Sequence, residues 1–490
     1  MCGKIKFIMI LILAVIITDA SAQNNQVLYF MNLPQNHQLN PAIRPSNSIY
    51  IGLPVISGIN VNINNNFINL RNVFLKGQSG DSVYSFIHRD YNADSFLAKT
   101  KDNNYVEPES SVQLFGIGFS AGKSSYFFLD INERVEGNIV IPGDLIKFFL
   151  KGNEGFIGHT IDLSSFKGDL KYYREIGLGF SKNFTDKLRI GVKGKLLFGI
   201  TAATVDNHAL GISVNNDLTH TLDADLNVNI SGPVIAYMSS ENKLDSLKID
   251  KNNLKTSSQI LGFLFDPKNF GLGLDIGATY ELSDRLMISA AITDLGFINW
   301  KNDITSLQAN SHLEINGLTM LDVYNKTKTF DQLGQAIQGT IRNSFVVSSS
   351  KAPFTTYIPF GVSLGGSYNV TSQFSAGLLS YSRIIDKQIH ELLTLSANLN
   401  IGNVFSTSLS YTAANDRYDN IGAGLSIRAG IAQFYLLSDR IPIKWTNINI
   451  DNKNIPMPET WNTINLRLGM NLVFGNRTRG KNDKPMIMVE

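Results

Sequence analysis

The chain has 490 residues, and its 43 Lys and Arg side chains are nearly balanced by 41 Asp and Glu, which gives a net charge of +2. This balance excludes a strong general attraction for nucleic acid or for an acidic partner. The single cysteine, Cys2, lies at the start of the chain, so the remainder is stabilised without disulfides; glycine (40) is abundant and proline (14) is scarce.

Residues 1–22 have the three parts of a secretory signal peptide. Lys4 and Lys6 precede an apolar run, and a small-residue A-S-A cleavage sequence ends at residue 22. The apolar run is shorter than the roughly 20 residues that a membrane-spanning helix needs. We therefore expect a cleaved signal peptide and an exported mature chain, rather than an uncleaved anchor.

Residues 35–46, directly before the first predicted strand, contain two prolines, lack the alternation of a strand and are rich in polar side chains. The sequence Asn40-Pro41-Ala42 within them favours a turn. A polar and irregular backbone of this kind is stable in water or inside a protein, but not against lipid. We expect this segment to lie either in water or within the lumen of a barrel.

From residue 47 to residue 474, apolar and polar residues alternate along many segments. A period of two predicts β-strands with two unlike faces. The clearest segments span residues 188–200, 272–282, 360–369, 393–401, 405–413, 421–430 and 463–474. Most have about 9–12 residues, the length of a tilted strand that crosses a bilayer, whereas strands of soluble sheets most often have about 5–6.

The connections between these segments alternate between short and long. Residues 183–186 and 283–284 are tight turns, whereas the links 231–270 and 296–358 are long. Outer-membrane barrels show this asymmetry, with the short turns on the periplasmic side. We predict an all-β fold, a transmembrane antiparallel β-barrel over residues 47–474. A secreted β-sandwich or repeat array is the alternative.

The number of strands depends on two places in the sequence. Segments 49–56 and 59–67 give an even total only if they form one bent strand, with Pro54 at a kink in the barrel wall. Counting a weak pair of segments at 209–215 and 221–230 gives 16 strands, and leaving this pair out gives 14. The periodicity alone leaves both numbers open.

Three further segments are not predicted to be strands. Helical spacing predicts two short loop helices, at Asp144–Leu150 and at Phe330–Ile341. Residues 475–490 carry four basic side chains and few apolar side chains that could pack. We expect them to form a short, disordered periplasmic tail.

Five basic side chains fall on the polar faces of predicted strands and are expected to line the lumen: Arg189, Lys193, Lys195, Arg428 and Arg467. One interpretation is a basic rung that attracts the carboxylate or phosphate group of a ligand. The other interpretation is ion pairing with acidic side chains of a plug or loop, which fills a small barrel.

Two tryptophans, Trp300 and Trp461, lie at the ends of predicted strands. Aromatic side chains at such positions commonly contact the interface between a membrane and water. Both are therefore candidates for contact with outer-membrane lipid.

The sequence contains no recognisable catalytic or metal-binding constellation. Its seven histidines are scattered without the spacing of a metal motif, and neither a nucleophile elbow nor a phosphate-binding loop occurs. We expect no enzyme activity, no cofactor and no metal. A barrel hydrolase, whose catalytic residues come from distant strands, is the alternative.

Asn40-Pro41-Ala42, followed by the first predicted strand, resembles the start of two groups of bacterial barrels. One group is the FadL-like transporters of fatty acids and hydrocarbons, whose N-terminal segment plugs a 14-stranded barrel. The other is a barrel family linked to type IX secretion and gliding in Bacteroidetes. The resemblance implies about 14 strands, and a plug formed by residues 23–46 with Asn40, Pro41 and Ala42 in it.

Over nearly the whole mature chain, the sequence is most similar to an uncharacterised Bacteroidetes outer-membrane family. It shares with that family Y-F-M-N-L-P-Q at residues 29–35, the L-N-P-A segment, and D-L-G-F-I-x-W at residues 294–300. This resemblance implies a location in the outer membrane of a Gram-negative bacterium.

Two functions follow as hypotheses, because a fold by itself does not fix a function. The first is FadL-like uptake of small hydrophobic or amphipathic molecules by a monomer, with sideways release near Pro54, and it predicts an apolar pocket in the lumen. The second is a non-transporting scaffold of a secretion or surface-attachment machinery. Its protein partners would contact the basic tail and residues 296–358, and it predicts a closed lumen and an exposed patch.

Overall fold

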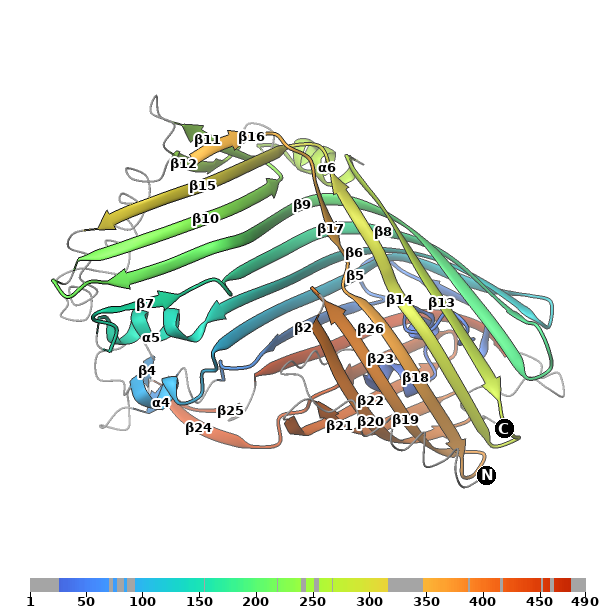
Figure 1. Ribbon diagram of the computed structural model, residues 1–490. Helices are drawn as coiled ribbons and strands as arrows, with labels where there is room; N and C mark the ends of the chain where they lie inside the picture. Colours follow the sequence, from blue (N-terminus) through green and yellow to red (C-terminus); the bar gives the residue numbers. More distant parts are fainter. Residues whose placement is uncertain are drawn as a thin grey trace, which may run out of the picture.

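A closed antiparallel β-barrel forms the centre of the computed structural model (Figure 1). The structure describes residues 26–69, 74–76, 83–85, 93–153, 155–217, 219–238, 244–250, 255–266, 268–315, 347–386, 388–414, 417–450, 453–458 and 462–476. Around the ring the strands are β1 (Asn47–Gly52) and β2 (Ile59–Asn65), which share one position, β5 (Asn103–Ala121), β6 (Ser125–Pro142), β8 (Lys167–Asn183), β9 (Leu188–Val214), β13 (Asn269–Glu281), β14 (Leu286–Trp300), β18 (Phe360–Asn369), β19 (Phe374–Ile385), β20 (Gln388–Ile401), β21 (Phe405–Ala414), β22 (Arg417–Ala429), β23 (Ala432–Ser438) and β26 (Thr463–Asn476).

The ring closes because β26 pairs with β23 on one side and with both β1 and β2 on the other. Strand β5 likewise pairs with both β1 and β2, so these two short strands occupy a single position in the wall. The barrel therefore has 14 strand positions, and the prediction of an all-β, 14-stranded antiparallel barrel is confirmed.

The barrel strands carry their apolar side chains on the outside. In β26, Leu466 and Leu468 are 40% and 38% exposed, whereas Asn465 and Arg467 are buried. The alternation of the sequence thus becomes two faces of one wall, because successive side chains of a strand point to opposite sides. Soluble sheets pack their apolar face on a core instead.

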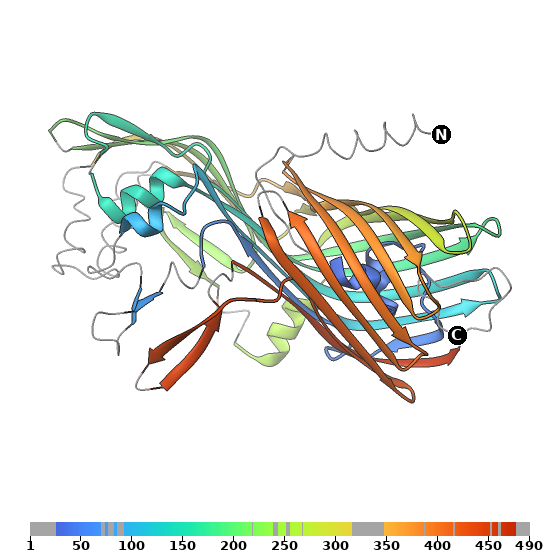
Figure 2. The same ribbon diagram turned by 90° about the horizontal axis from the view of Figure 1, so that it is seen from below.

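Residues 26–46 lie inside this ring, as the dark blue ribbon in Figure 2 shows. They form helix α2 (Gln26–Phe30) and the 3-10 turn η1 (Pro34–Gln38), and every residue of α2 is buried. Val27, Leu28 and Met31 pack against Tyr435 and Leu437 of β23. The segment therefore has its own small apolar core within a mostly polar lumen.

Two glycines let the N-terminal segment lie directly against the wall. A Cβ atom at Gly191 of β9 would stand 2.3 Å from the backbone of Pro41, and one at Gly277 of β13 would stand 2.0 Å from the side chain of Asn40. Any larger residue at these positions would force the segment or the strand to move.

The wall is interrupted between β1 and β2, at the place where the sequence puts Pro54. Six residues, 53–58, separate β1 from β2, whereas only three residues of β5, 113–115, lie between Val112 and Gly116, their partners in the register. The extra residues bulge, with Val55 in the left-handed region at φ 66°. Val55 and Ile56 are each 48% exposed on the outside.

The sheet continues beyond the barrel on one side, where β9, β10 and β15 reach away from it (Figure 1). Strand β9 has 27 residues. Residues 188–199 of β9 pair with β13 within the ring, and residues 202–214 pair with β10 (His220–Ser231), which in turn pairs with β15 (Ile304–Ile315). Segments 209–215 and 221–230 are thus strands outside the ring, and the 16-stranded alternative is wrong.

Smaller elements complete the part of the chain that the structure describes. Strands β7 (His159–Asp162), β16 (Val347–Ser350) and β17 (Phe354–Tyr357) extend the large sheet, and β3 (Phe74–Lys76) with β4 (Val83–Ser85), β11 (Val234–Met238) with β12 (Leu244–Ile249), and β24 (Trp445–Ile450) with β25 (Lys453–Pro458) form separate hairpins. The helices outside the barrel are α4 (Ala93–Leu97), α5 (Gly143–Lys151) and α6 (Ser257–Phe265).

The predicted loop helix at Asp144–Leu150 is confirmed as α5. The predicted helix at Phe330–Ile341, the signal peptide over residues 1–22 and most of the tail over residues 475–490 lie outside the described residues. No helix among the described residues is long and apolar enough to cross a membrane.

Candidate functional site

A buried polar cluster joins the N-terminal segment to the wall near the short turns. The alternation of β6 turns Asp130 inward, and η1, which starts at Pro34, presents His37 to it. The His37 Nε2 atom lies 2.5 Å from Asp130 Oδ2, and the Tyr50 hydroxyl donates to Asp130 Oδ1 at 2.8 Å. The Nζ atom of Lys193 is 3.5 Å from Asp130 Oδ2. A carboxylate without solvent is stable only with such partners.

A second cluster lies further along the lumen and links five strands by ion pairs. Glu175 of β8 accepts from Lys193 and from Arg134, at 2.8 Å each. Lys195 of β9 reaches Asp275 at 2.7 Å and Asp294 at 2.6 Å. Each basic group is shared by two carboxylates or more, so the lumen here is filled by a network rather than lined by free charges.

Asp294 reaches this network because β14 is irregular at that residue. Its backbone lies in the left-handed region, at φ 62°, and the register with β13 shifts between Leu274 and Ile276. Aspartate tolerates this conformation better than most residues. Its N–H donates to Asp275 Oδ1 at 2.7 Å, and its carboxylate accepts from Arg134 at 2.7 Å. The bulge thus aims one more carboxylate into the lumen.

A cavity of about 440 Å³ opens on the other side of this network, away from the short turns. Tyr357, Ile358, Pro359 and Phe360, where β17 passes into β18, form an apolar part of its lining. Its polar part includes these charged side chains: Glu107, Glu109, Glu136, Lys167, Asp169, Lys171, Arg383 and Asp386. Its volume is within the range of pockets that hold small molecules.

A gap of about 60 Å³ adjoins this cavity and leads toward the N-terminal segment. The two spaces share Glu109, Pro359 and Arg383 in their linings. The gap also borders Gln38 and Leu39 at the end of η1. The cavity, the charged gap and the N-terminal segment therefore follow one another along the inside of the barrel.

With this geometry in place, the chain can be compared with known proteins. Residues 41–439 match the profile of the family described as "Family of unknown function (DUF5723)". The chain belongs to this family. No curated protein is significantly similar to it in sequence.

Several solved structures are similar to this DUF5723 barrel at low sequence identity. The Ralstonia pickettii toluene transporter TbuX is 10% identical, over 91% of this chain and 95% of that one, with a TM-score of 0.39. The Pseudomonas putida toluene transporter TodX is 9% identical, over 94% and 98%, with a TM-score of 0.39. A Pseudomonas aeruginosa FadL homologue is 9% identical, over 91% and 95%, also with a TM-score of 0.39.

Among the five predicted basic residues of this DUF5723 barrel, Lys193 and Lys195 lie in the charged network and are paired with acids. These acids come from neighbouring strands, and not from a plug or a loop. Arg467 is buried as well, but its Nη1 atom donates to the amide of Gln38 at 3.1 Å, and within the described residues its Nε atom has no hydrogen-bond partner.

The other two basic residues lie apart from the network, close to the short turns. Arg189 donates to Asn183 Oδ1 at 2.6 Å, across the turn between β8 and β9. Arg428 donates to Asn47 Oδ1 at 3.1 Å and to the carbonyl oxygen of Val473. The five residues therefore do not form one rung.

The predicted plug residues are all buried against the barrel wall. Asn40 donates to the carbonyl oxygens of Ala278 and Ala290, at 3.4 and 3.3 Å, and its own Oδ1 accepts from the N–H of Ala42. Pro41 lies against Gly191. The sequence predicts a tight turn here, and these contacts hold that turn against β13 and β14.

Trp300 lies at the end of β14, but its ring does not face outward. The side chain is fully buried, its indole N–H donates to Thr356 Oγ1 at 2.9 Å, and its ring stacks on Phe354. This placement differs from the expected contact with a membrane interface, because the ring packs in a buried cluster with Tyr173, Leu197 and Ile298. Trp461 lies outside the described residues.

Sequence reasoning missed the acidic half of the network. Asp130, Glu175 and Asp275 are as buried as the lysines that they contact, and Asp294 is half-buried. Parity along a strand would have found Asp275, which alternates with Leu274 and Ile276. No group of three or more His, Cys, Asp or Glu in the described part of the chain is placed to hold a metal ion.

Proposed function

We propose that this chain is an outer-membrane β-barrel that takes up small amphipathic molecules through its lumen. The membrane location is supported by the outer face of the wall. Leu178, Leu364 and Leu409, on three different strands, are 63%, 61% and 57% exposed. Apolar exposure that continues around a closed barrel suits lipid and is costly in water.

The observation that carries the transport proposal is the mixed chemistry of the 440 Å³ cavity. Ile358, Pro359 and Phe360 can accept an apolar group, while Lys171 and Asp169, paired at 2.7 Å, can bind a polar one. A purely apolar molecule would leave these charges without solvent, whereas an amphipathic molecule satisfies both parts of the lining.

The N-terminal segment has the place of a plug in this proposal. Residues 26–46 border the 60 Å³ gap through Gln38 and Leu39, so in this proposal they obstruct the way of a molecule out of the cavity. The interruption at Pro54 is the candidate exit through the wall, because Ser57 of that bulge accepts from Gln35 of the N-terminal segment at 3.2 Å through its carbonyl oxygen. A shift of the N-terminal segment would therefore change the contacts of the bulge.

The test of this function uses the purified full-length barrel and its bound molecules. We would extract the protein with organic solvent and identify the molecules by mass spectrometry, for wild type and for Asn138→Trp, which places an indole in the cavity. Asn227→Trp on β10, outside the barrel, is the matched control. We expect a stoichiometric amphipathic molecule in wild type and control and a several-fold loss in Asn138→Trp. Absence of any bound molecule from all three proteins would contradict the proposal.

A scaffold for a protein machinery is the second candidate, because the sheet of β9, β10 and β15 projects from the barrel. Transport requires no such projection. A photo-crosslinker at His208, which is exposed on β9, tests it in cells. One dominant crosslinked protein, with no bound small molecule in the extraction, would favour the scaffold.

A further inference from the structure

Helix α6 is an apolar helix that lies outside the barrel with its side chains exposed. Its sequence is SSQILGFLF, and a capping box between Thr256 and Gln259 fixes its start. Leu261 and Phe265 are 54% and 59% exposed. A helix of nine residues is marginal in water by itself, so its stability has to come from what it contacts.

The C-terminal end of α6 contacts the outer wall. The guanidinium of Arg174 lies 4.1 Å from the centre of the Phe265 ring. Arg174 points outward from β8, because its neighbours Tyr173 and Glu175 point into the lumen, and it donates to Glu133 of β6 at 2.6 Å through its Nε atom. The helix therefore covers an ion pair that would otherwise stand on the apolar outer face.

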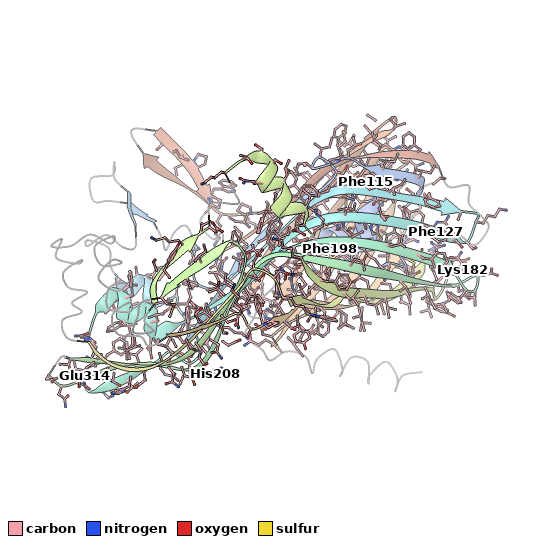
Figure 3. All side chains as sticks on the ribbon, turned by 90° about the horizontal axis from the view of Figure 1, so that it is seen from above. Phe115, Phe127, Lys182, Phe198, His208 and Glu314 are labelled. Atoms are coloured by element: carbon pink, nitrogen blue, oxygen red, sulfur yellow. The ribbon has the colours of Figure 1, made fainter. Side chains whose placement is uncertain are left out.

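The strand register shows at which height of the wall α6 contacts the Glu133–Arg174 pair. Glu133 pairs with Arg174, Arg174 with Phe198, and Phe198 with Phe270, so one row crosses β6, β8, β9 and β13. Phe270 is 47% exposed and is the first outward residue of β13, which follows α6 after residues 266–268. On β13 this row is where the exposed apolar face of the strand begins. Figure 3 shows α6 outside the wall at this end of the barrel, near Phe198. Beyond this end the sheet continues as the extension, which is formed by β9, β10 and β15.

We infer that α6 is a lipid-contacting helix that lies in the interface between membrane and water at the outer rim of the barrel. The Phe265 ring covers the Glu133–Arg174 pair, and the exposed Leu261, one helical turn before it, enters the lipid. The lipid is the occupant because the exposed face of α6 continues the exposed apolar band that begins at Phe270. Interfacial helices bury their apolar side about 5–10 Å into the boundary of headgroups and acyl chains. This inference rests on the membrane location proposed above.

The test uses single cysteines, because the chain has no cysteine after Cys2. Leu261→Cys, Leu272→Cys and Asp217→Cys would each be spin-labelled in the full-length barrel, reconstituted in phosphatidylcholine vesicles, and measured for collision with oxygen and with a water-soluble nickel complex. Leu272 is an outward residue of β13, 45% exposed, and Asp217 is exposed in a turn of the extension.

We expect the ratio of oxygen to nickel collisions at Leu261 to lie several-fold above that at Asp217 and below that at Leu272. A ratio at Leu261 equal to that at Asp217, with a high ratio at Leu272, would overturn the interfacial helix and leave the membrane barrel standing. Equally low ratios at Leu261 and Leu272 would instead overturn the membrane location itself. A low accessibility of Leu261 to both reagents would show that protein covers the helix, and would also overturn the inference.

Discussion

The imidazole of His37 lies 2.5 Å from the carboxylate of Asp130, and neither side chain has any exposed surface. One residue belongs to the N-terminal segment and the other to the wall, 93 positions apart in the chain. The pair is continued by Lys193 and Glu175 on the next strands. The N-terminal segment is therefore held by the same charged network that fills the lumen.

Removing the carboxylate should destabilise the barrel, since it leaves His37 and Lys193 without their shared acid. We predict that Asp130→Asn lowers the free energy of unfolding by about 3–5 kcal/mol. Urea unfolding of the detergent-solubilised protein measures this change. Asp217→Asn, in an exposed turn, should change it by no more than about 0.5 kcal/mol, and an equal effect of the two substitutions would refute the role of the network.

Two glycines of one strand allow a matched test of the N-terminal segment as a plug. A Cβ atom at Gly191 collides with the backbone of Pro41, whereas one at Gly194 meets nothing within 4 Å. We predict that Gly191→Ala displaces the segment and raises the ion conductance of the barrel in a planar bilayer, while Gly194→Ala leaves it at the wild-type level. Unchanged conductance for Gly191→Ala, in a protein that is correctly folded, would argue against a plug.

Trp300 and Trp445 should respond differently to truncation, because their surroundings are opposite. Trp300 is fully buried and hydrogen-bonded to Thr356, whereas Trp445 is 56% exposed. Trp300→Ala should cost about 3–5 kcal/mol of unfolding free energy, the usual range for a buried aromatic residue. Trp445→Ala should cost less than about 0.5 kcal/mol. A small cost at Trp300 would mean that its ring is not part of the core.

The outer extension should loosen in acid at His220. Burial against Phe148 and Asn153, whose Oδ1 atom accepts from the His220 ring at 2.8 Å, lowers the pKa of His220 below its ordinary value. The folded state therefore favours the neutral ring, and the stability that this contributes is present above about pH 6.5 and lost as the pH falls below it. Hydrogen exchange of α5, β7 and β10 at pH 5 and pH 8 measures this loss. His220→Gln should remove most of the difference, and an unchanged difference would assign it to another group.

The fold was predictable because the outward and inward side chains of a barrel strand alternate in the sequence. Leu466 and Leu468 point out and Asn465 and Arg467 point in, as their alternation requires. The number of 14 strands was harder to predict, because β10 has the same alternation as the barrel strands. Only its pairing with β9 and β15 places it outside the ring. Register between strands is a tertiary property that the period of one strand does not contain.

The site was only half predictable, for a related reason. Parity put Lys193 and Lys195 in the lumen, but it could not show that Asp275 and Asp294 would neutralise them, since these acids come from strands about 80 to 100 residues further along. Trp300 shows the same limit, because β17, which contacts it, follows a long connection. The sequence pattern did not predict helix α6, because the helix is short and its apolar residues do not follow a helical period.

Flux into proteoliposomes is the direct test of uptake through the lumen. Vesicles that enclose albumin would trap an incoming fluorescent short-chain amphiphile, and protein-free vesicles would give the rate of spontaneous crossing. We predict saturable uptake above that rate for wild type and Asn227→Trp, and a return toward the protein-free rate for Asn138→Trp, whose indole fills the cavity. Uptake by the wild-type barrel that equals the protein-free rate would contradict the account and favour the scaffold.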